Sequence, residues 1–215
     1  MSSGAKLYLD YVLAGSPESA RAVLSAALEA APIASLLIRP ATDKTYDVET
    51  LRALIAIAQK KGVAVLLLSD DALARELGAD GVHVSWVPDV VQQFKSVRRA
   101  AGSAAIVGAD AGRTRHDAME IGEADADYVA FGIPAHVEDR SRAADRQIDL
   151  ISWWSEVFEI PCVALDVADV EHARRLADAG ADFVGVTITA ENSASEAAAR
   201  VRAYSEAVSA HQDVR

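Results

Sequence analysis

The stretch Leu77-Gly78-Ala79-Asp80-Gly81-Val82-His83 decides the fold, because it joins the end of an amphipathic helical segment to the start of a short apolar run. Related phrases recur at Ala126-Asp127-Tyr128-Val129 and at Ala179-Gly180-Ala181-Asp182-Phe183-Val184. Small residues and an aspartate thus stand before an apolar run at three places in the chain. This repetition predicts a chain assembled from successive α/β units.

Eight apolar runs follow one another, with amphipathic helical patterns such as Asp47–Lys61 and Asp169–Ala179 between them. The runs are continuous rather than alternating, as expected for parallel strands that are covered on both faces. Strand followed by helix, eight times, predicts a closed parallel (β/α)8, or TIM, barrel. An open doubly wound sheet is the alternative. The apolar runs are Leu7–Leu13, Ala34–Arg39, Val63–Ser69, Gly81–Ser85, Ala104–Ala109, Asp127–Gly132, Pro161–Asp166 and Asp182–Thr187.

The length of 215 residues, with 51% hydrophobic residues, suits one such barrel, and we expect a single domain, 1–215. A net charge of −11 argues against a general nucleic-acid binder or a protein of anionic membranes, because those surfaces repel an acidic protein. The lone Cys162 cannot form an internal disulfide. The first apolar run is too short for a signal peptide or membrane span, so we expect a cytoplasmic protein.

Helix start and stop signals support the same division of the chain. Ser16-Pro17-Glu18 is typical of a helix start, with a capping serine and a first-turn proline. Four glycines are expected to close helices: Gly62, Gly78, Gly102 and Gly180. The aspartates of the recurring phrase then lie at strand starts, the end of a barrel that serves stability, whereas chemistry belongs at the rim where strands end.

The predicted strand ends carry the candidate site residues. Asp166 is a candidate general base, with a salt-bridge partner as the alternative, and His83 is either a catalytic group or a hydrogen-bonded interior histidine. Arg39 would clamp a phosphate through two hydrogen bonds, or pair with Asp10 or Asp70. Further candidates for phosphate binding are Arg113, Arg115, Arg140, Thr187 and Thr189.

Arginines are concentrated in two of the predicted rim loops. Besides Arg113, Arg115 and Arg140, these loops contain Arg142 and Arg146. In so acidic a protein, five arginines on one face would form a local anion site. The alternative is a solvated loop in which the arginines offset neighbouring acidic residues.

Several segments, taken in order, resemble thiamine phosphate synthase and its relative, the thiazole tautomerase of thiamine synthesis. They are Val65–Asp71, Leu77–Val84, Ala126–Gly132, Ile160–Leu165 and Gly180–Asp182, and they span most of the chain. The resemblance implies a barrel whose rim binds a pyrimidine diphosphate through magnesium and joins it to a thiazole phosphate. In such a synthase diphosphate leaves the pyrimidine methylene, and the thiazole nitrogen captures the resulting cation. Positive groups and the metal neutralise the leaving charge.

The chain departs from the synthase pattern at several rim positions. Of the family's Gln-x-Arg-x-Lys after the second strand only Arg39 remains, and His136–Arg140 replaces the Thr-x-Thr-Lys loop after the sixth strand. Asp166-Val167 replaces the Gly-Gly after the seventh. Asp70 is the remaining candidate metal ligand, because Pro88 stands where the second metal carboxylate is expected. We therefore predict that Mg²⁺ binds weakly without ligand.

These observations predict a divergent thiamine phosphate synthase-like transferase with low or altered activity, acting on a phosphorylated, thiamine-related small molecule. One alternative is a non-catalytic ligand-binding or regulatory barrel. Another is an isomerase of the tautomerase type, although Ile133 stands where the acid/base histidine of that enzyme follows the glycine, and His136 lies three residues later. The adjacent Trp153 and Trp154 cannot both face the sheet, so one is a candidate contact in a homo-oligomer.

Overall fold

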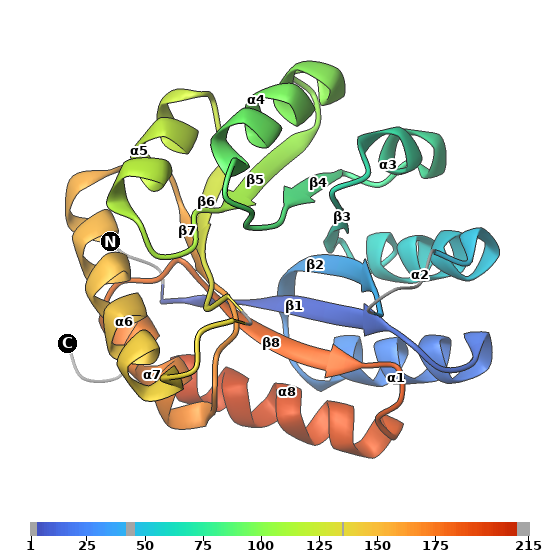
Figure 1. The fold of residues 1–215 in the computed structure, drawn as a ribbon. Coiled ribbons are helices and arrows are strands. Elements are labelled where there is room, and N and C mark those ends of the chain that lie inside the picture. The colour runs from blue at the N-terminus through green and yellow to red at the C-terminus, as the bar shows by residue number, and fades with distance from the viewer. Residues whose placement is uncertain (1–3, 42–45, 135, 210–215) are drawn as a thin grey trace.

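The computed structural model describes residues 4–41, 46–134 and 136–209. Within these ranges, eight parallel strands alternate with eight helices. Each strand pairs with the next and β8 pairs with β1, so the sheet closes on itself. The helices follow one another around the outside in chain order (Figure 1). The (β/α)8 barrel is confirmed, and the open sheet is excluded.

The elements are bounded as follows. The strands are β1 (Lys6–Leu13), β2 (Ile33–Pro40), β3 (Ala64–Leu68), β4 (Gly81–Val84), β5 (Ile106–Asp110), β6 (Tyr128–Phe131), β7 (Cys162–Ala164) and β8 (Phe183–Thr189). The helices are α1 (Pro17–Ala30), α2 (Val48–Gln59), α3 (Asp71–Leu77), α4 (Val90–Ala101), α5 (Arg115–Glu123), α6 (Arg140–Val157), α7 (Val170–Asp178) and α8 (Ala194–Ser209). Among these residues, no helix is long and apolar enough to cross a membrane.

Six of the strands are shorter than, or shifted from, the predicted apolar runs by a few residues, while β1 and β2 extend slightly beyond them. The largest difference is at β7, which spans three residues where a run of six, Pro161–Asp166, was expected. Pairing ends there because the chain turns sharply: Asp166 has a φ of +54°, in the left-handed region that L-residues rarely adopt. Hydrophobicity continues past the point where a strand leaves the sheet, so it overestimates strand length.

Two hydrophobic layers hold the barrel together. The larger lies between the strands and the surrounding helices, and the smaller fills the barrel interior with side chains such as Tyr8, Leu66, Tyr128 and Val163. Gly108 has a steric role in the inner layer, because a Cβ at this position would overlap the Tyr128 ring. The Tyr128 ring therefore fits inside the barrel only because position 108 on β5 has no side chain.

Three aspartates close the end of the barrel where strands begin, and we call them the N-terminal aspartates: Asp80, Asp127 and Asp182. Each precedes its own strand and accepts a hydrogen bond from an amide at the start of the preceding strand. The donors are Val65, Val107 and Cys162, at N···O distances of 2.8, 2.7 and 2.9 Å respectively. Because each carboxylate ties two neighbouring strands together, the recurring phrase has the expected structural role.

The capping signals also agree with the structure. The Ser16 hydroxyl accepts a hydrogen bond from the Ser19 amide at the start of α1, where Pro17 is the first helical residue. All four predicted helix-closing glycines have positive φ values, between +70° and +98°.

The two adjacent tryptophans face different surroundings. Trp154 is fully buried, stacks on Phe158 and donates from its indole nitrogen to the Ile160 carbonyl oxygen at 2.7 Å. Trp153 is half-buried and has the Arg115 guanidinium over its ring, 4.7 Å from the centroid. The expectation that the two rings cannot share one face is confirmed, whereas a contact of Trp153 with a second copy stays a prediction.

Candidate active site

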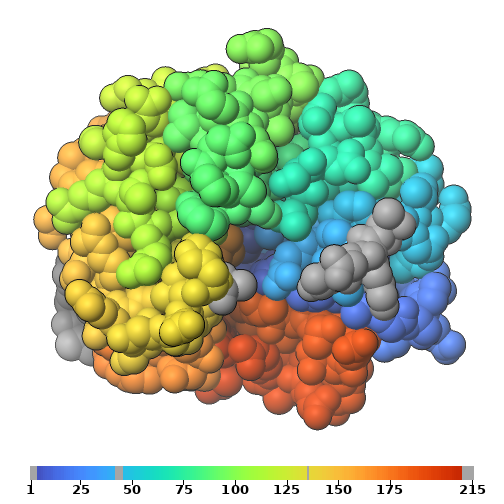
Figure 2. All heavy atoms as spheres, viewed as in Figure 1, coloured from blue at the N-terminus to red at the C-terminus, as the bar shows by residue number. Residues whose placement is uncertain are grey.

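The ends of the strands surround a hollow at the C-terminal rim of the barrel. The hollow consists of an inner cavity of about 200 Å³ and an outer cavity of about 590 Å³. The two cavities share four lining residues: Ser85, Trp86, Asp110 and Asp166. Figure 2 shows the hollow near the middle of the face, between the blue, green, yellow and orange parts of the chain. The inner cavity also includes Asp10, Arg39 and His83, so the sequence-predicted Arg39, His83 and Asp166 lie together.

Asp110 is the last residue of β5, and its carboxylate is buried beneath the hollow. Its Oδ1 accepts hydrogen bonds from the amides of Gly112 and Gly132, both at 2.8 Å. Burial nevertheless raises the pKa of Asp110 to about 6, more than the two amides lower it, and the nearby Asp166 adds to the rise. Asp110 therefore changes charge just below neutral pH, which suits a group that exchanges protons.

Asp166 follows β7 and lies beside Asp110. Its Oδ2 accepts a hydrogen bond from the Ile133 amide at 2.9 Å, the peptide next to the one that serves Asp110. Both carboxylates press on Gly132: a Cβ there would overlap Asp110 Oδ2 and lie 2.9 Å from Asp166 Oδ2. The Asp166 residue as a whole is exposed to solvent at the rim. Its carboxylate is nevertheless partly desolvated, which raises the pKa of Asp166. The two aspartates form a close pair of carboxylates on consecutive amides.

Asp10, on β1, is the third carboxylate of the hollow, and it binds Arg39. The guanidinium donates through Nε to Oδ1 at 2.6 Å and through a second nitrogen to Oδ2 at 3.0 Å. Thr187 Oγ1 donates to the same carboxylate at 2.9 Å. The Asp10 carboxylate is the main cause of the raised pKa of Arg39, which stays protonated. Two of Arg39's donors are thus directed at the protein, although the residue still lines the cavity.

His83 lies on β4 at the bottom of the inner cavity, connected to the barrel interior by a chain of hydroxyl groups. Its Nδ1 and the Tyr128 hydroxyl are 2.7 Å apart, and the Tyr128 and Tyr8 hydroxyls are 3.1 Å apart. Burial lowers the pKa of His83 to about 4, so the imidazole is neutral at physiological pH. It is both a hydrogen-bonded interior histidine and a lining residue of the hollow, so the two interpretations of the sequence are compatible.

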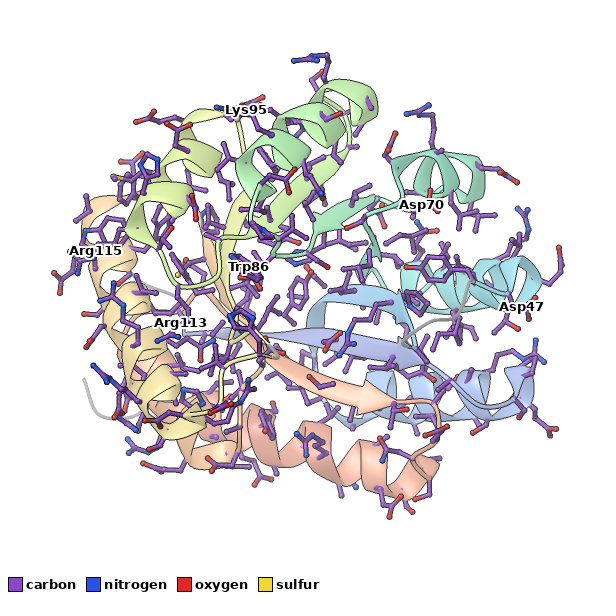
Figure 3. All side chains as sticks on the ribbon, viewed as in Figure 1. Asp47, Asp70, Trp86, Lys95, Arg113 and Arg115 are labelled. Carbon is purple, nitrogen blue, oxygen red and sulfur yellow. The ribbon has the colours of Figure 1, made fainter. Side chains whose placement is uncertain are left out.

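An aromatic side chain borders the hollow. Trp86, just after β4, packs directly on Gly112, where a Cβ would overlap the indole, and its ring is 5.3 Å from that of His136. Figure 3 shows Trp86 near the middle of the barrel, with Arg113 on its α6 side. A planar ring at the mouth of a cavity offers a stacking surface to a heterocyclic ligand.

The remaining predicted phosphate ligands lie at different places on the rim. Arg140 lines the outer cavity and donates to the carbonyl oxygens of Ile133 and Pro134 at 3.1 and 3.4 Å. Arg113 lines a neighbouring pocket, whereas Arg115 lies over Trp153 near the outer edge (Figure 3). Thr189 is the last residue of β8, and its amide donates to the Asn192 side chain in the following turn at 3.0 Å. None of these four is brought against Asp110 by a described hydrogen bond.

Asp70 lies at the start of α3, to one side of the hollow (Figure 3). Its Oδ1 caps the helix by accepting from the Leu73 amide at 2.9 Å, as the sequence allowed for one of the two neighbouring aspartates. Among the described residues, no three or more His, Cys, Asp or Glu side chains are arranged to hold a metal ion. The donor set does not fit a magnesium ion held by the protein alone.

Two acidic residues of the hollow, Asp10 and Asp110, were absent from the sequence-based set of site residues, as was Trp86. Asp10 entered the sequence analysis only as a partner for Arg39. Asp110 and Trp86 do stand at or just after strand ends, which is the signal that identifies rim residues. Without the structure nothing ranks one strand end above another, because the amides that bind Asp110 come from loops after two different strands.

A closed (β/α)8 barrel with carboxylates, an arginine and an indole around one rim hollow belongs to the class of barrels that bind small charged molecules where their strands end. Comparison with known proteins narrows this class. The family model for thiamine monophosphate synthase matches residues 11–190, and the chain belongs to that family.

Curated relatives support the assignment. The chain is 37% identical over 195 residues to a thiamine-phosphate synthase of Hyphomonas neptunium, covering 88% of this chain and 87% of the relative. It is 39% identical over 187 residues to one of Rhodospirillum centenum, with coverage of 84% and 86%. The resemblance that the sequence motifs indicated is confirmed.

Solved structures show the same fold at lower identity. Thiamine phosphate pyrophosphorylase from Pyrococcus furiosus superposes with a TM-score of 0.72 at 18% identity, covering 96% of this chain and 97% of that one. Tryptophan synthase of Mycobacterium tuberculosis superposes with a TM-score of 0.70 at 16% identity, with coverage of 95% and 93%. At such low sequence identities, these structural similarities show the barrel fold alone.

Proposed function

We propose that this protein is a divergent thiamine phosphate synthase-type transferase that binds a phosphorylated, thiamine-related small molecule at the rim hollow. Family membership supports the reaction type. The observation that carries the proposal for this chain is the group of three carboxylates, Asp10, Asp110 and Asp166, lining one cavity beside Trp86. Negative charge beside an aromatic surface suits a flat heterocycle that is positive or becomes positive during the reaction.

In the proposed reaction the bond between the pyrimidine methylene and the diphosphate oxygen breaks, and the oxygen keeps the electron pair. A nitrogen lone pair of the thiazole phosphate then forms the new bond to the methylene carbon, which leaves a positive thiazolium ring. Asp110 and Asp166 would stabilise the positive charge first on the methylene and then on the ring, because they are fixed in place by the amides of Gly132 and Ile133. Arg140, on the outer side of the hollow, would face the phosphate end of the ligand.

The rate of this reaction is expected to be low. Arg39 already donates two hydrogen bonds to Asp10, Asp70 caps a helix, and Asp166 stands where the synthases have a glycine. Fewer positive groups are therefore free to neutralise the departing diphosphate. Loss of one preorganised donor costs roughly a hundredfold to a thousandfold in rate, so several losses should leave slow turnover.

The test is a direct assay with the purified protein, the pyrimidine diphosphate, the thiazole phosphate and magnesium. We expect thiamine phosphate to form at least about a hundredfold more slowly than with a synthase that has the Thr-x-Thr-Lys loop. Comparable turnover would contradict the proposed divergence. If no product forms while thiamine phosphate raises the melting temperature, the non-catalytic binding barrel replaces the transferase.

One observation favours the isomerase as a second candidate. Asp110 has a pKa of about 6 and shares the hollow with Asp166, so one carboxyl can donate a proton while the other accepts one. Such a pair would move a proton between two atoms of a thiazole ring. The candidate is tested by following exchange of solvent deuterium into the thiazole phosphate supplied alone, which a transferase without its second substrate would not catalyse.

Three further expectations stay proposals. A cytoplasmic location rests on the single cysteine, Cys162, which is free and buried. The acidic net charge favours small-molecule ligands over nucleic acid or anionic membranes. Homo-oligomer formation through the surface near Trp153 is open to test by light scattering.

A further inference from the structure

A second pocket lies beside the hollow, and it has the opposite charge. It encloses about 560 Å³ and is lined by Arg113 from the loop after β5 and by Val137, Asp139, Arg142 and Arg146 from the loop after β6 and the start of α6. The same two loops supply Gly112, Ile133 and Pro134 around the hollow. The pocket and the hollow are therefore built by neighbouring segments of the rim.

The guanidinium groups of the three arginines have no ion-pair partner among the described residues. No hydrogen bond or ion pair joins the guanidinium groups of Arg113, Arg142 and Arg146 to another described residue, whereas Arg98 and Arg175 each pair with a carboxylate. The acidic groups nearby are already engaged. Asp139 accepts from the Arg142 amide at 3.0 Å as the cap of α6, and Asp145 pairs with Arg175 at 2.9 Å.

The position of these arginines is unfavourable for the fold. Arg142 and Arg146 are four residues apart on α6 and share one face, where like charges repel. Arg142 also lies in the first turn, where the helix dipole disfavours cations. Asp139 is the one carboxylate among the residues that line the pocket, so three guanidinium groups face a single negative charge. An arrangement that costs stability and has no partner inside the protein indicates a partner outside it.

We propose that Arg113, Arg142 and Arg146 form an anion subsite that binds the phosphate group of the ligand whose ring occupies the acidic hollow. Arginine is suited to this task because its planar guanidinium donates paired hydrogen bonds to phosphate oxygens. The rim is thus divided by charge, with carboxylates for a cationic ring and arginines for a phosphate. This inference rests on the proposed function for the identity of the ring, but the subsite itself is testable without turnover.

The first test uses inorganic phosphate and calorimetry on the purified protein at low salt. Wild type should bind phosphate, and Arg146→Gln and Arg113→Gln should each weaken binding by about tenfold or more, the usual effect of losing a charge-assisted hydrogen bond. Arg202→Gln, at an exposed position of α8, is the matched control and should bind as wild type does. Glutamine keeps most of the side-chain stem, and circular dichroism of each variant establishes that it is folded.

A second test separates the two halves of the ligand. Thiamine carries the positive ring without phosphate, and thiamine phosphate carries both. Arg146→Gln should weaken binding of thiamine phosphate by about tenfold while leaving thiamine binding unchanged, and Asp166→Asn should weaken both. Absence of phosphate binding by wild type at about 10 mM, or equal binding by all the arginine variants, would overturn the subsite. A failed synthase assay with intact phosphate binding would overturn the proposed function alone.

Discussion

Three aspartates precede strands at one end of the barrel and three line the hollow at the other, and the comparison shows how position decides what a carboxylate does. Each N-terminal aspartate accepts a hydrogen bond from a backbone amide of the preceding strand, and Asp127 also pairs with Arg98 at 2.8 Å. At the rim, Asp110 and Asp166 also accept hydrogen bonds from backbone amides, but desolvation raises the pKa of both. The N-terminal carboxylates stabilise strand pairing, whereas the rim carboxylates are held in a cavity at a cost to the fold.

Substitution of the rim pair should give the largest effect. Asp166→Asn and Asp110→Asn should each lower the rate of thiamine phosphate formation by about a hundredfold, because each removes a fixed negative charge beside the developing cation. Asparagine suits both positions: it tolerates the left-handed backbone at 166 and keeps an acceptor for the amides at 110. The rate is measured under saturating substrates. Asp127→Asn, at the opposite end, is the control, and equal loss in all three variants would contradict the comparison.

The next effect concerns the pH dependence of stability. Asp110 has a pKa of about 6 in the folded protein, against roughly 3.9 in an unfolded chain. The folded state therefore holds this proton more tightly, and the stability it contributes is present below pH ~4 and lost as pH rises through ~6. Urea unfolding of wild type and Asp110→Asn should show their difference falling by roughly 2 to 3 kcal/mol between pH 4 and 7. A constant difference would show that Asp110 titrates normally.

A smaller loss is expected at the N-terminal end. Asp182→Ala leaves the Cys162 amide without its acceptor and should lower the free energy of unfolding by about 1 to 3 kcal/mol at pH 7. Asp182→Asn keeps an acceptor oxygen and should recover part of that loss. Neither variant should change turnover. A stable Asp182→Ala protein with impaired catalysis would reverse the division between the two ends.

The same contrast explains how far the sequence predicts this molecule. The repeated aspartate phrase and eight apolar runs predict the barrel because each α/β unit is specified locally. Arg39, His83 and Asp166 are predicted at the hollow because they stand on or after strands. The pairing of Arg39 with Asp10 depends on the register of β1 with β2, and the binding of Asp110 to Gly132 depends on the next strand's loop. Such contacts between segments distant in sequence, or between separate strands, require the structure.

The smallest effect on stability is expected at Asp70, the candidate magnesium ligand at the rim. Asp70→Asn keeps the oxygen that caps α3 and should change the free energy of unfolding by less than about 0.5 kcal/mol. Asp70→Ala loses the cap and should cost about 1 kcal/mol.

Calorimetry should find weak magnesium binding to the free wild-type protein. Asp70 has at most one further acidic residue nearby, and magnesium usually relies on carboxylates together with substrate phosphates. Asp71→Asn, at the neighbouring exposed ion pair with Arg75, is the matched control. Tight binding by wild type that Asp70→Asn abolishes and Asp71→Asn does not would make Asp70 a metal ligand, and would move the acidic site of the rim from the barrel axis out to α3.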